Sequence, residues 1–174
     1  LIKSPMKFSI TSIFIAFVSV SLFSCNKESK LFVLKSPDET GIDFVNQIIE
    51  SDSFNILTDE YIFNGGGLAV ADFNNDGNLD LFFTGNQVSN KLYLNQGNLK
   101  FKDISAISGI EASSYWSTGT TAIDINGDGW MDIYVAAAML KGPGERNNLL
   151  FVNQGADENG NISFIEQASQ YGIA

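Results

Sequence analysis

The chain has 174 residues, a formal net charge of −10, no histidine and one cysteine. A hydrophobic content of 44% is enough to bury a core and argues against global disorder. The excess of acidic residues disfavours nucleic acid and anionic lipid as partners, because neither would be attracted electrostatically. Without histidine the chain lacks the commonest general base and the usual zinc ligand, which still leaves catalysis by carboxylates open.

The N-terminal segment is typical of an export signal. After Met6 and a lysine, residues 10–22 are mostly apolar, carry no charge and are too few for a comfortable membrane span. The segment ends in Leu-Phe-Ser-Cys, which resembles the lipobox of bacterial lipoproteins, with phenylalanine at a position where it is less usual. The resemblance implies that residues 1–24 are a signal peptide starting at Met6, that Cys25 is lipidated, and that residues 25–30 are a tether.

This resemblance also predicts where the protein is found. It implies export and anchoring to the bacterial outer membrane, and the charged residues after Cys25 favour exposure at the cell surface. Contact with the membrane is then expected only through the lipid on Cys25. The alternative for Cys25 is an ordinary buried or free cysteine, which as the only cysteine could form no intramolecular disulfide.

Residues 31–66 are interpreted as an N-terminal half-repeat followed by a connector. The apolar run at 31–34 and the later Thr-Gly-Ile at 40–42 resemble the closing part of a repeat unit, and the residues that follow are less regular. A run of three glycines at 65–67 leads into the first complete unit.

Two complete units follow, residues 67–117 and residues 118–174. Short apolar runs predict four strands in each unit, at 68–71, 79–84, 91–94 and 101–104, and again at 120–123, 131–136, 148–152 and 164–166. The spacing of matching residues grows from 52 between Asp72 and Asp124 to 63 between Gly109 and Gly172. This growth predicts two surface insertions, near residues 140–146 and 156–161.

The loop between the first two strands of each unit carries the motif D-x-N-x-D-G-x-x-D, at 72–80 and 124–132. Oxygen ligands at positions 1, 3, 5 and 9, a carbonyl at position 7 and glycine at position 6 suit a calcium ion. Ligands without sulfur or imidazole favour calcium over zinc or copper. The predicted ligands of two calcium ions are Asp72, Asn74, Asp76, the Asn78 carbonyl and Asp80, and Asp124, Asn126, Asp128, the Trp130 carbonyl and Asp132.

These loops differ from the EF-hand. Position 12 is Phe83 in the first loop and Val135 in the second, where an EF-hand has glutamate, and the flanks are typical of strands. A metal in such a strand–loop–strand hairpin would have a structural role, because no nearby base or nucleophile is specified. The alternative is that the Asn/Asp-Gly runs form tight turns without metal.

The order of the elements predicts an all-β fold, a partial β-propeller of four-stranded blades with calcium-binding β-loop-β hairpins. A blade has two faces to bury and needs a neighbour on each side. Closed propellers have roughly 4–8 blades, and only two complete blades and a half-blade can be recognised. The sequence therefore predicts an N-terminal part of a longer protein, or alternatively a small open sheet that closes by self-association.

Residues 67–81 (Gly-Leu-Ala-Val-Ala-Asp-Phe-Asn-Asn-Asp-Gly-Asn-Leu-Asp-Leu) resemble the FG-GAP/VCBS repeat of integrin α-chain propellers. With Asn-Lys-Leu-Tyr-Leu-Asn-Gln-Gly at 90–97 and a closing Gly-Ile, the chain is similar to bacterial relatives of cartilage acidic protein, which often end in an ASPIC/UnbV domain. The resemblance covers residues 31–174. It implies a calcium-bearing propeller at the cell surface that serves binding and adhesion.

The preferred functional prediction is a calcium-binding surface lipoprotein that is not an enzyme and acts as a binding or adhesion module for protein or glycan. The alternative is part of a propeller enzyme, or an accessory protein, for extracellular polysaccharide degradation, although the well-placed carboxylates are already assigned to metal. The sequence does not separate the binding module from a purely structural spacer.

Overall fold

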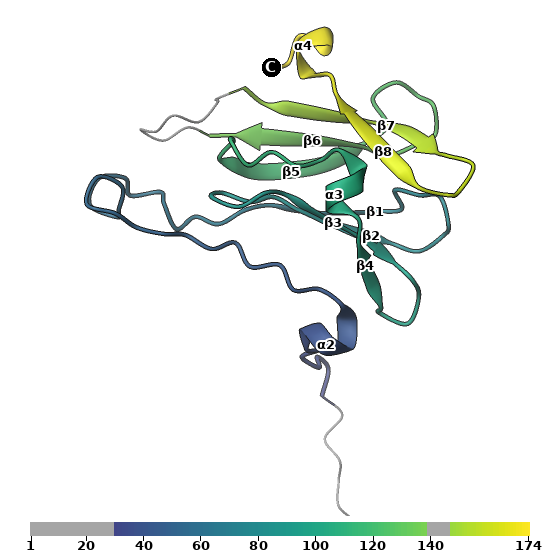
Figure 1. Ribbon diagram of the computed structural model, residues 1–174, viewed down its shortest axis with the longest axis horizontal. Helices are drawn as coiled ribbons and strands as arrows, with labels where there is room; N and C mark the ends of the chain where they lie inside the picture. Colours follow the sequence, from purple (N-terminus) through teal and green to yellow (C-terminus); the bar gives the residue numbers. More distant parts are fainter. Residues whose placement is uncertain (1–29, 139–146) are drawn as a thin grey trace, which may run out of the picture. The chain divides into compact units, whose positions relative to one another are not determined.

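The computed structural model describes residues 30–138 and 147–174 and divides into two units, 1–34 and 35–174. The described residues of the first unit, 30–34, form no helix or strand. The second unit contains two four-stranded sheets (Figure 1). The signal segment, Cys25 and the insertion predicted near 140–146 lie outside the described residues. Within the described ranges, no helix has the length and apolar character needed to cross a membrane.

The first sheet is an antiparallel meander of consecutive strands. Its strands are β1 (Leu68–Ala71), β2 (Asp80–Phe83), β3 (Lys91–Asn95) and β4 (Phe101–Asp103). A single helical turn, α2 (Pro37–Thr40), precedes the sheet, and another, α3 (Ser105–Ser108), follows it. α2 begins where the sequence favours it, because the Ser36 side chain accepts a hydrogen bond from the Glu39 N–H at 3.2 Å and a proline follows Ser36.

The second sheet repeats this order. Its strands are β5 (Ser117–Ile123), β6 (Asp132–Ala137), β7 (Leu149–Ala156) and β8 (Ile162–Glu166), and α4 (Ala168–Tyr171) follows them. The two sheets pack face to face, and the main core lies between them. Phe82 and Leu92 of the first sheet are buried with Ile133 and Phe151 of the second. Apolar side chains that alternate along each strand therefore face the partner sheet.

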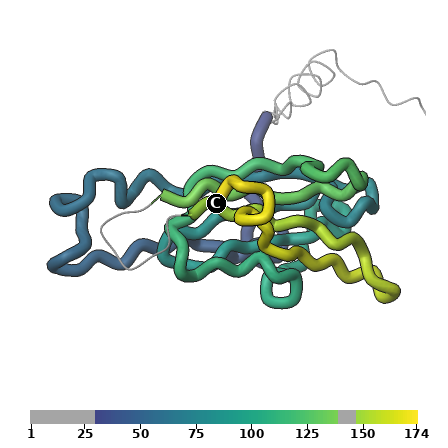
Figure 2. Tube along the Cα trace, turned by 90° about the horizontal axis from the view of Figure 1, so that it is seen from above, coloured from purple at the N-terminus to yellow at the C-terminus, as the bar shows by residue number. Residues whose placement is uncertain are grey.

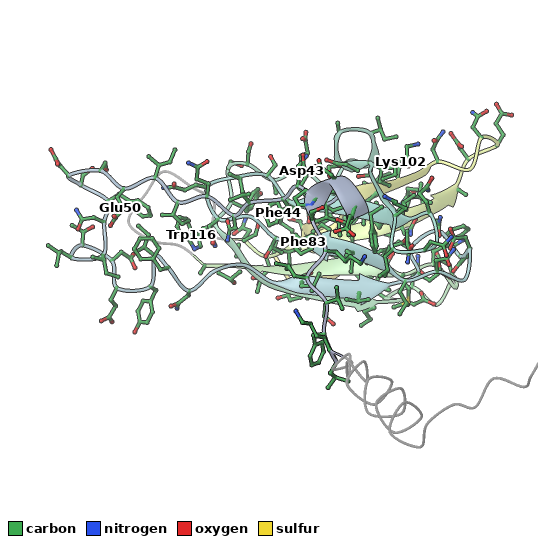
Figure 3. The ribbon with its side chains drawn as sticks, turned by 90° about the horizontal axis from the view of Figure 1, so that it is seen from below. Asp43, Phe44, Glu50, Phe83, Lys102 and Trp116 are labelled. Atoms are coloured by element: carbon green, nitrogen blue, oxygen red, sulfur yellow. The ribbon has the colours of Figure 1, made fainter. Side chains whose placement is uncertain are left out.

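The connector between α2 and β1 lies partly against the first sheet, on the face that does not contact the second sheet. Phe44 stacks on Phe83 with ring centroids 5.2 Å apart, and the Tyr93 hydroxyl donates to the Asp43 carboxylate at 2.8 Å (Figure 3). Further along, the connector extends past the strands, as the blue segment of the tube shows (Figure 2). Edge-to-face contact of Phe54 with Trp116, at 5.5 Å, packs this part against the residues before β5.

The prediction of an all-β fold built from four-stranded blades is confirmed, and all eight strands lie at the expected places. β5 begins at Ser117, three residues earlier than predicted. The insertion expected near 156–161 is the turn of a hairpin, because β7 continues to Ala156 and β8 starts at Ile162, which pairs with it. The three single-turn helices were not predicted, since four residues are too few to show a helical period.

Candidate metal loops

The two acidic loops connect β1 to β2 and β5 to β6, and each is folded around its first aspartate. The Asp72 carboxylate accepts hydrogen bonds from the backbone N–H groups of Asp76 at 3.1 Å and Gly77 at 2.8 Å. In the second loop Asp124 accepts from Asp128 at 3.1 Å and Gly129 at 2.9 Å, and also from Gly127 at 2.7 Å. The first ligand position therefore also holds the turn together.

The side chains at positions 3 and 5 also make the same hydrogen bonds in both loops. The side chain of Asn74 donates to the Asp76 carboxylate at 3.0 Å, and that of Asn126 donates to Asp128 at 2.7 Å. Asp76 then accepts from the N–H of Asn78, and Asp128 from the N–H of Trp130, each at 2.8 Å. The two loops thus share the hydrogen bonds of positions 1, 3 and 5, and the second loop adds the bond from Gly127 to Asp124.

Two positions in each loop need a left-handed backbone. Gly77 and Gly129, at position 6, both have a φ of 87°. Position 4 is also left-handed, with a φ of 56° at Asn75 and 75° at Gly127. Sequence reasoning missed position 4, although asparagine and glycine are the residues that adopt this conformation most readily. The Asn75 side chain also donates to the Gly129 carbonyl at 3.2 Å, so the two loops touch.

The ninth positions, Asp80 and Asp132, are fully buried and begin β2 and β6. We call these two residues the clamp aspartates. The Asp80 carboxylate accepts from the backbone N–H of Phe73 at 2.9 Å and of Asn95 at 2.8 Å. Asp132 accepts likewise from Ile125 at 2.9 Å and Asn153 at 2.7 Å. Asp80 therefore joins its loop to the end of β3, and Asp132 joins its loop to Asn153 within β7.

The carboxylates of one loop differ in their electrostatic surroundings. Burial raises the pKa of Asp80 to about 6, against the hydrogen bonds from Asn95 and Phe73, and the nearby charges of Asp76 and Asp72 raise it further. The pKa of Asp132 is raised for the same reason, first by burial. The N–H of Asn78 lowers the pKa of Asp76. A dication at the loop would relieve the mutual repulsion of these carboxylates.

The structure places all ten predicted metal ligands in or at the ends of the two loops. Their donors are hard oxygens, and a carboxylate oxygen that accepts one hydrogen bond keeps a further lone pair, so the donor chemistry fits calcium. In the described part of the chain, however, no three acidic, histidine or cysteine side chains are grouped closely enough to hold a metal ion as they stand. Calcium binding by the loops therefore stays a prediction.

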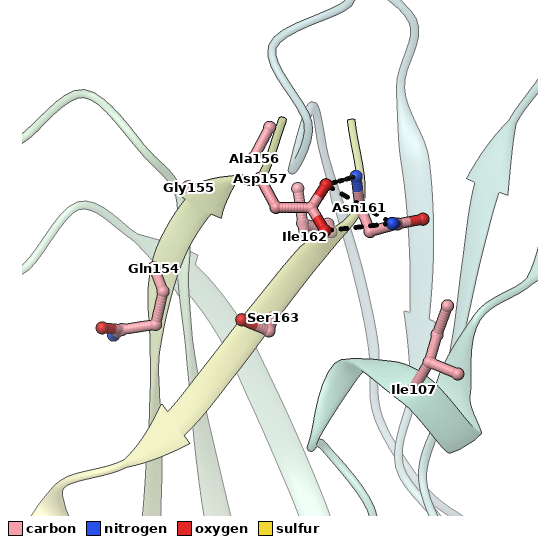
Figure 4. A pocket seen from close by; sticks show the side chains of 8 residues that line it. All are labelled: Ile107, Gln154, Gly155, Ala156, Asp157, Asn161, Ile162 and Ser163. Carbon is pink, nitrogen blue, oxygen red and sulfur yellow. Dashed lines mark hydrogen bonds between the residues drawn. The ribbon is translucent and has the colours of Figure 1, made fainter. Parts of the chain in front are cut away.

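A separate open recess of about 410 Å³ lies between α3 and the β7–β8 turn (Figure 4). Its lining includes Ile107, Ser163 and Asp157. The Asp157 carboxylate accepts hydrogen bonds from the backbone N–H and the side chain of Asn161, so it is engaged in the local turn. Asp157 is the only carboxylate among the residues that line this recess, so they do not supply the pair that glycoside hydrolysis usually needs.

Comparison with protein-family models gives two overlapping matches. An FG-GAP-like repeat matches residues 72–135, from the first residue of the first loop into β6. An FG-GAP repeat matches residues 115–163, which include the second loop and reach β8. The first match contains both acidic loops, and the second match contains the second loop with the strands on both sides of it. FG-GAP repeats are therefore found in the chain, between residues 72 and 163.

Proposed function

We propose that the chain is a calcium-binding module of a surface lipoprotein that holds a protein or glycan ligand and performs no catalysis. The observation that carries this proposal is which positions of the two loops hold the same residue. Asp, Asn, Asp, Gly and Asp recur at positions 1, 3, 5, 6 and 9, whereas the other four positions differ. These side chains hold the turn through hydrogen bonds, and oxygen ligands at the same positions are also what a calcium site requires.

In this proposal calcium stiffens the end of each sheet. Three carboxylates within nine residues repel one another, and a bound ion would offset that repulsion. Because the Asn75 side chain donates to the Gly129 carbonyl, fixing one loop would also restrict the motion of the other. Rigid loops beside each other would then form a preorganised surface, which lowers the entropic cost of binding a partner. FG-GAP repeats suggest a binding module of the integrin-propeller type, which agrees with this role.

The binding role can be tested with the chain immobilised and exposed to envelope-protein extracts and a glycan array, in calcium and in EDTA. We expect at least one ligand to be retained in calcium and released in EDTA. The Asp76→Ala/Asp128→Ala double variant should not retain it, because one loop ligand is lost at each site. Asp157→Ala, an exposed acid outside the loops, is the matched control and should bind like the unmodified chain. Failure of the folded chain to retain any ligand would contradict the proposal.

We also propose that the protein is anchored to the outer membrane through a lipid on Cys25. The support is the Leu-Phe-Ser-Cys sequence after an apolar segment of export-signal length. A single acyl chain anchors only weakly, so stable anchoring needs more than one. A mass spectrum of the protein from its native membrane that shows an unmodified cysteine would contradict this anchor.

A further inference from the structure

The connector between α2 and β1 contains an exposed loop of unusual composition. We call residues 49–63 the connector loop. It contains no glycine and no proline, and five of its large apolar side chains are exposed. Single exposed apolar residues are ordinary on a protein surface, but several together mark an interaction site. The five side chains are Ile49, Ile56, Leu57, Tyr61 and Phe63.

Side chains within the connector loop fix its backbone. The Asn55 side chain accepts a hydrogen bond from the N–H of Leu57 at 2.9 Å and donates one to the Ser51 carbonyl at 2.9 Å. The Glu50 carboxylate accepts from the N–H of Ile56 at 3.2 Å. Leu57 is 93% exposed, so its side chain extends into solvent from a turn that these hydrogen bonds hold in place.

The connector loop is also attached to the residues around it. The Gln87 side chain, in the turn between β2 and β3, accepts from the N–H of Ile49 at 2.6 Å and donates to its carbonyl at 3.2 Å. The Phe54 ring contacts Trp116, and Ile62 is fully buried. A loop that is already ordered loses less conformational entropy when it binds. The exposed apolar side chains are therefore preorganised for a partner.

The charge of the connector loop indicates the chemistry of that partner. The loop has four acidic residues and no lysine, arginine or histidine; the acids are Glu50, Asp52, Asp59 and Glu60. No basic residue occurs between Lys35 and Lys91. Apolar side chains among acids favour a partner that combines apolar side chains with positive charge. The same acids disfavour an anionic membrane surface.

We propose that the connector loop is a docking surface for a basic amphipathic segment of a partner protein, with apolar side chains on one face and lysine or arginine on the other. The apolar face would cover Leu57, Tyr61 and Phe63, and the cations would approach Asp52 and Glu60. The connector leads into the start of β1, whereas the first acidic loop follows its end. The docking surface is therefore separate from the acidic loops, goes beyond the proposed function and does not require calcium.

A synthetic helical peptide with leucine on one face and lysine on the other can serve as the probe. We expect the unmodified chain to bind it equally in EDTA and in calcium, measured by fluorescence anisotropy of the labelled peptide. A peptide with glutamate in place of lysine, or with serine in place of leucine, should bind at least about tenfold more weakly, because each lacks one half of the complementary chemistry.

A pair of apolar substitutions locates the peptide on the chain. Leu57→Ser/Tyr61→Ser should lower the affinity at least about tenfold, because two exposed apolar contacts are lost. Leu99→Ser/Ile107→Ser is the matched control, since both residues are exposed and lie outside the connector loop. The control should bind the peptide like the unmodified chain.

A pair of charge substitutions tests the electrostatic part. Asp52→Asn/Glu60→Gln should lower the affinity about threefold to tenfold and reduce its dependence on salt, because exposed charge pairs are weak and screened. Neither carboxylate takes part in the hydrogen bonds that fix the loop, so the backbone should be unchanged. Glu111→Gln/Glu158→Gln removes two acids outside the loop and should leave the affinity unchanged.

Three results would overturn the docking surface. One is a folded chain, checked by circular dichroism, that does not bind the leucine–lysine peptide. Another is binding that Leu57→Ser/Tyr61→Ser leaves unchanged, which would place the peptide on another acidic surface. The third is sedimentation of the chain with phosphatidylcholine vesicles that the same pair abolishes, which would make the loop a membrane contact. Because peptide binding is measured in EDTA, its failure is distinct from failure of calcium-dependent ligand binding.

Discussion

Replacement of Asp80 with alanine is expected to lower the free energy of unfolding by about 2–4 kcal/mol, measured by urea denaturation in EDTA. The carboxylate is fully buried and accepts hydrogen bonds from the N–H groups of Phe73 and Asn95. Alanine would leave both donors without a partner, and an unsatisfied buried donor costs about 1–3 kcal/mol. Asp132→Ala should have a similar effect through Ile125 and Asn153.

Asp76→Ala is the matched control for this experiment. Asp76 belongs to the same loop, but its hydrogen bonds are exposed, so its loss in EDTA should cost less than about 1 kcal/mol. Equal losses for Asp80→Ala and Asp76→Ala in EDTA would contradict the assignment of Asp80 as a clamp aspartate.

Gly109→Ala is expected to destabilise the fold by about 2–4 kcal/mol, against about 1 kcal/mol for Gly172→Ala. Both glycines end a single-turn helix with a left-handed backbone, at φ values of 79° and 69°, so the strain of placing alanine there is similar. At Gly109 the new Cβ would also lie 2.7 Å from the Phe164 carbonyl oxygen, whereas at Gly172 it would meet nothing within 4 Å. The sheets would have to move apart to relieve the first contact.

The difference between the two glycine variants isolates the contact between sheets. Urea denaturation of both variants under one set of conditions is sufficient. The cost of placing alanine in a left-handed backbone is similar in the two variants, so it cancels in the difference between their free energies of unfolding. If both variants lost the same stability, α3 would not hold the second sheet through Gly109.

The sheets could be predicted from the sequence because short apolar runs between turn residues are typical of strands, and the same order of runs occurs twice. The runs at 68–71 and 91–94 coincide with β1 and β3 to within one residue. The loops could be located because their spacing repeats. The start of β5 was missed, since Ser117 and Gly119 have no strand preference, and Ser117 pairs with Ala137 of β6 across an irregularity in the register.

Other features depend on contacts that a linear pattern does not contain. The ninth aspartate was predicted only as a ligand, because its burial depends on hydrogen bonds from Asn95 and Asn153 in the neighbouring strands β3 and β7. Packing of Phe44 on Phe83 joins residues 39 positions apart in an irregular connector. The role of Gly109 depends on the carbonyl of Phe164 in the next sheet, so the residue itself carries no sign of it.

Isothermal calorimetry of calcium with the folded chain tests the central claim most directly. The account predicts saturable binding to two sites, and loss of that binding in the Asp76→Ala/Asp128→Ala variant while circular dichroism shows the fold retained. Absence of binding by a folded, unmodified chain would contradict the account. The two acidic loops would then be hairpin turns held by their own hydrogen bonds.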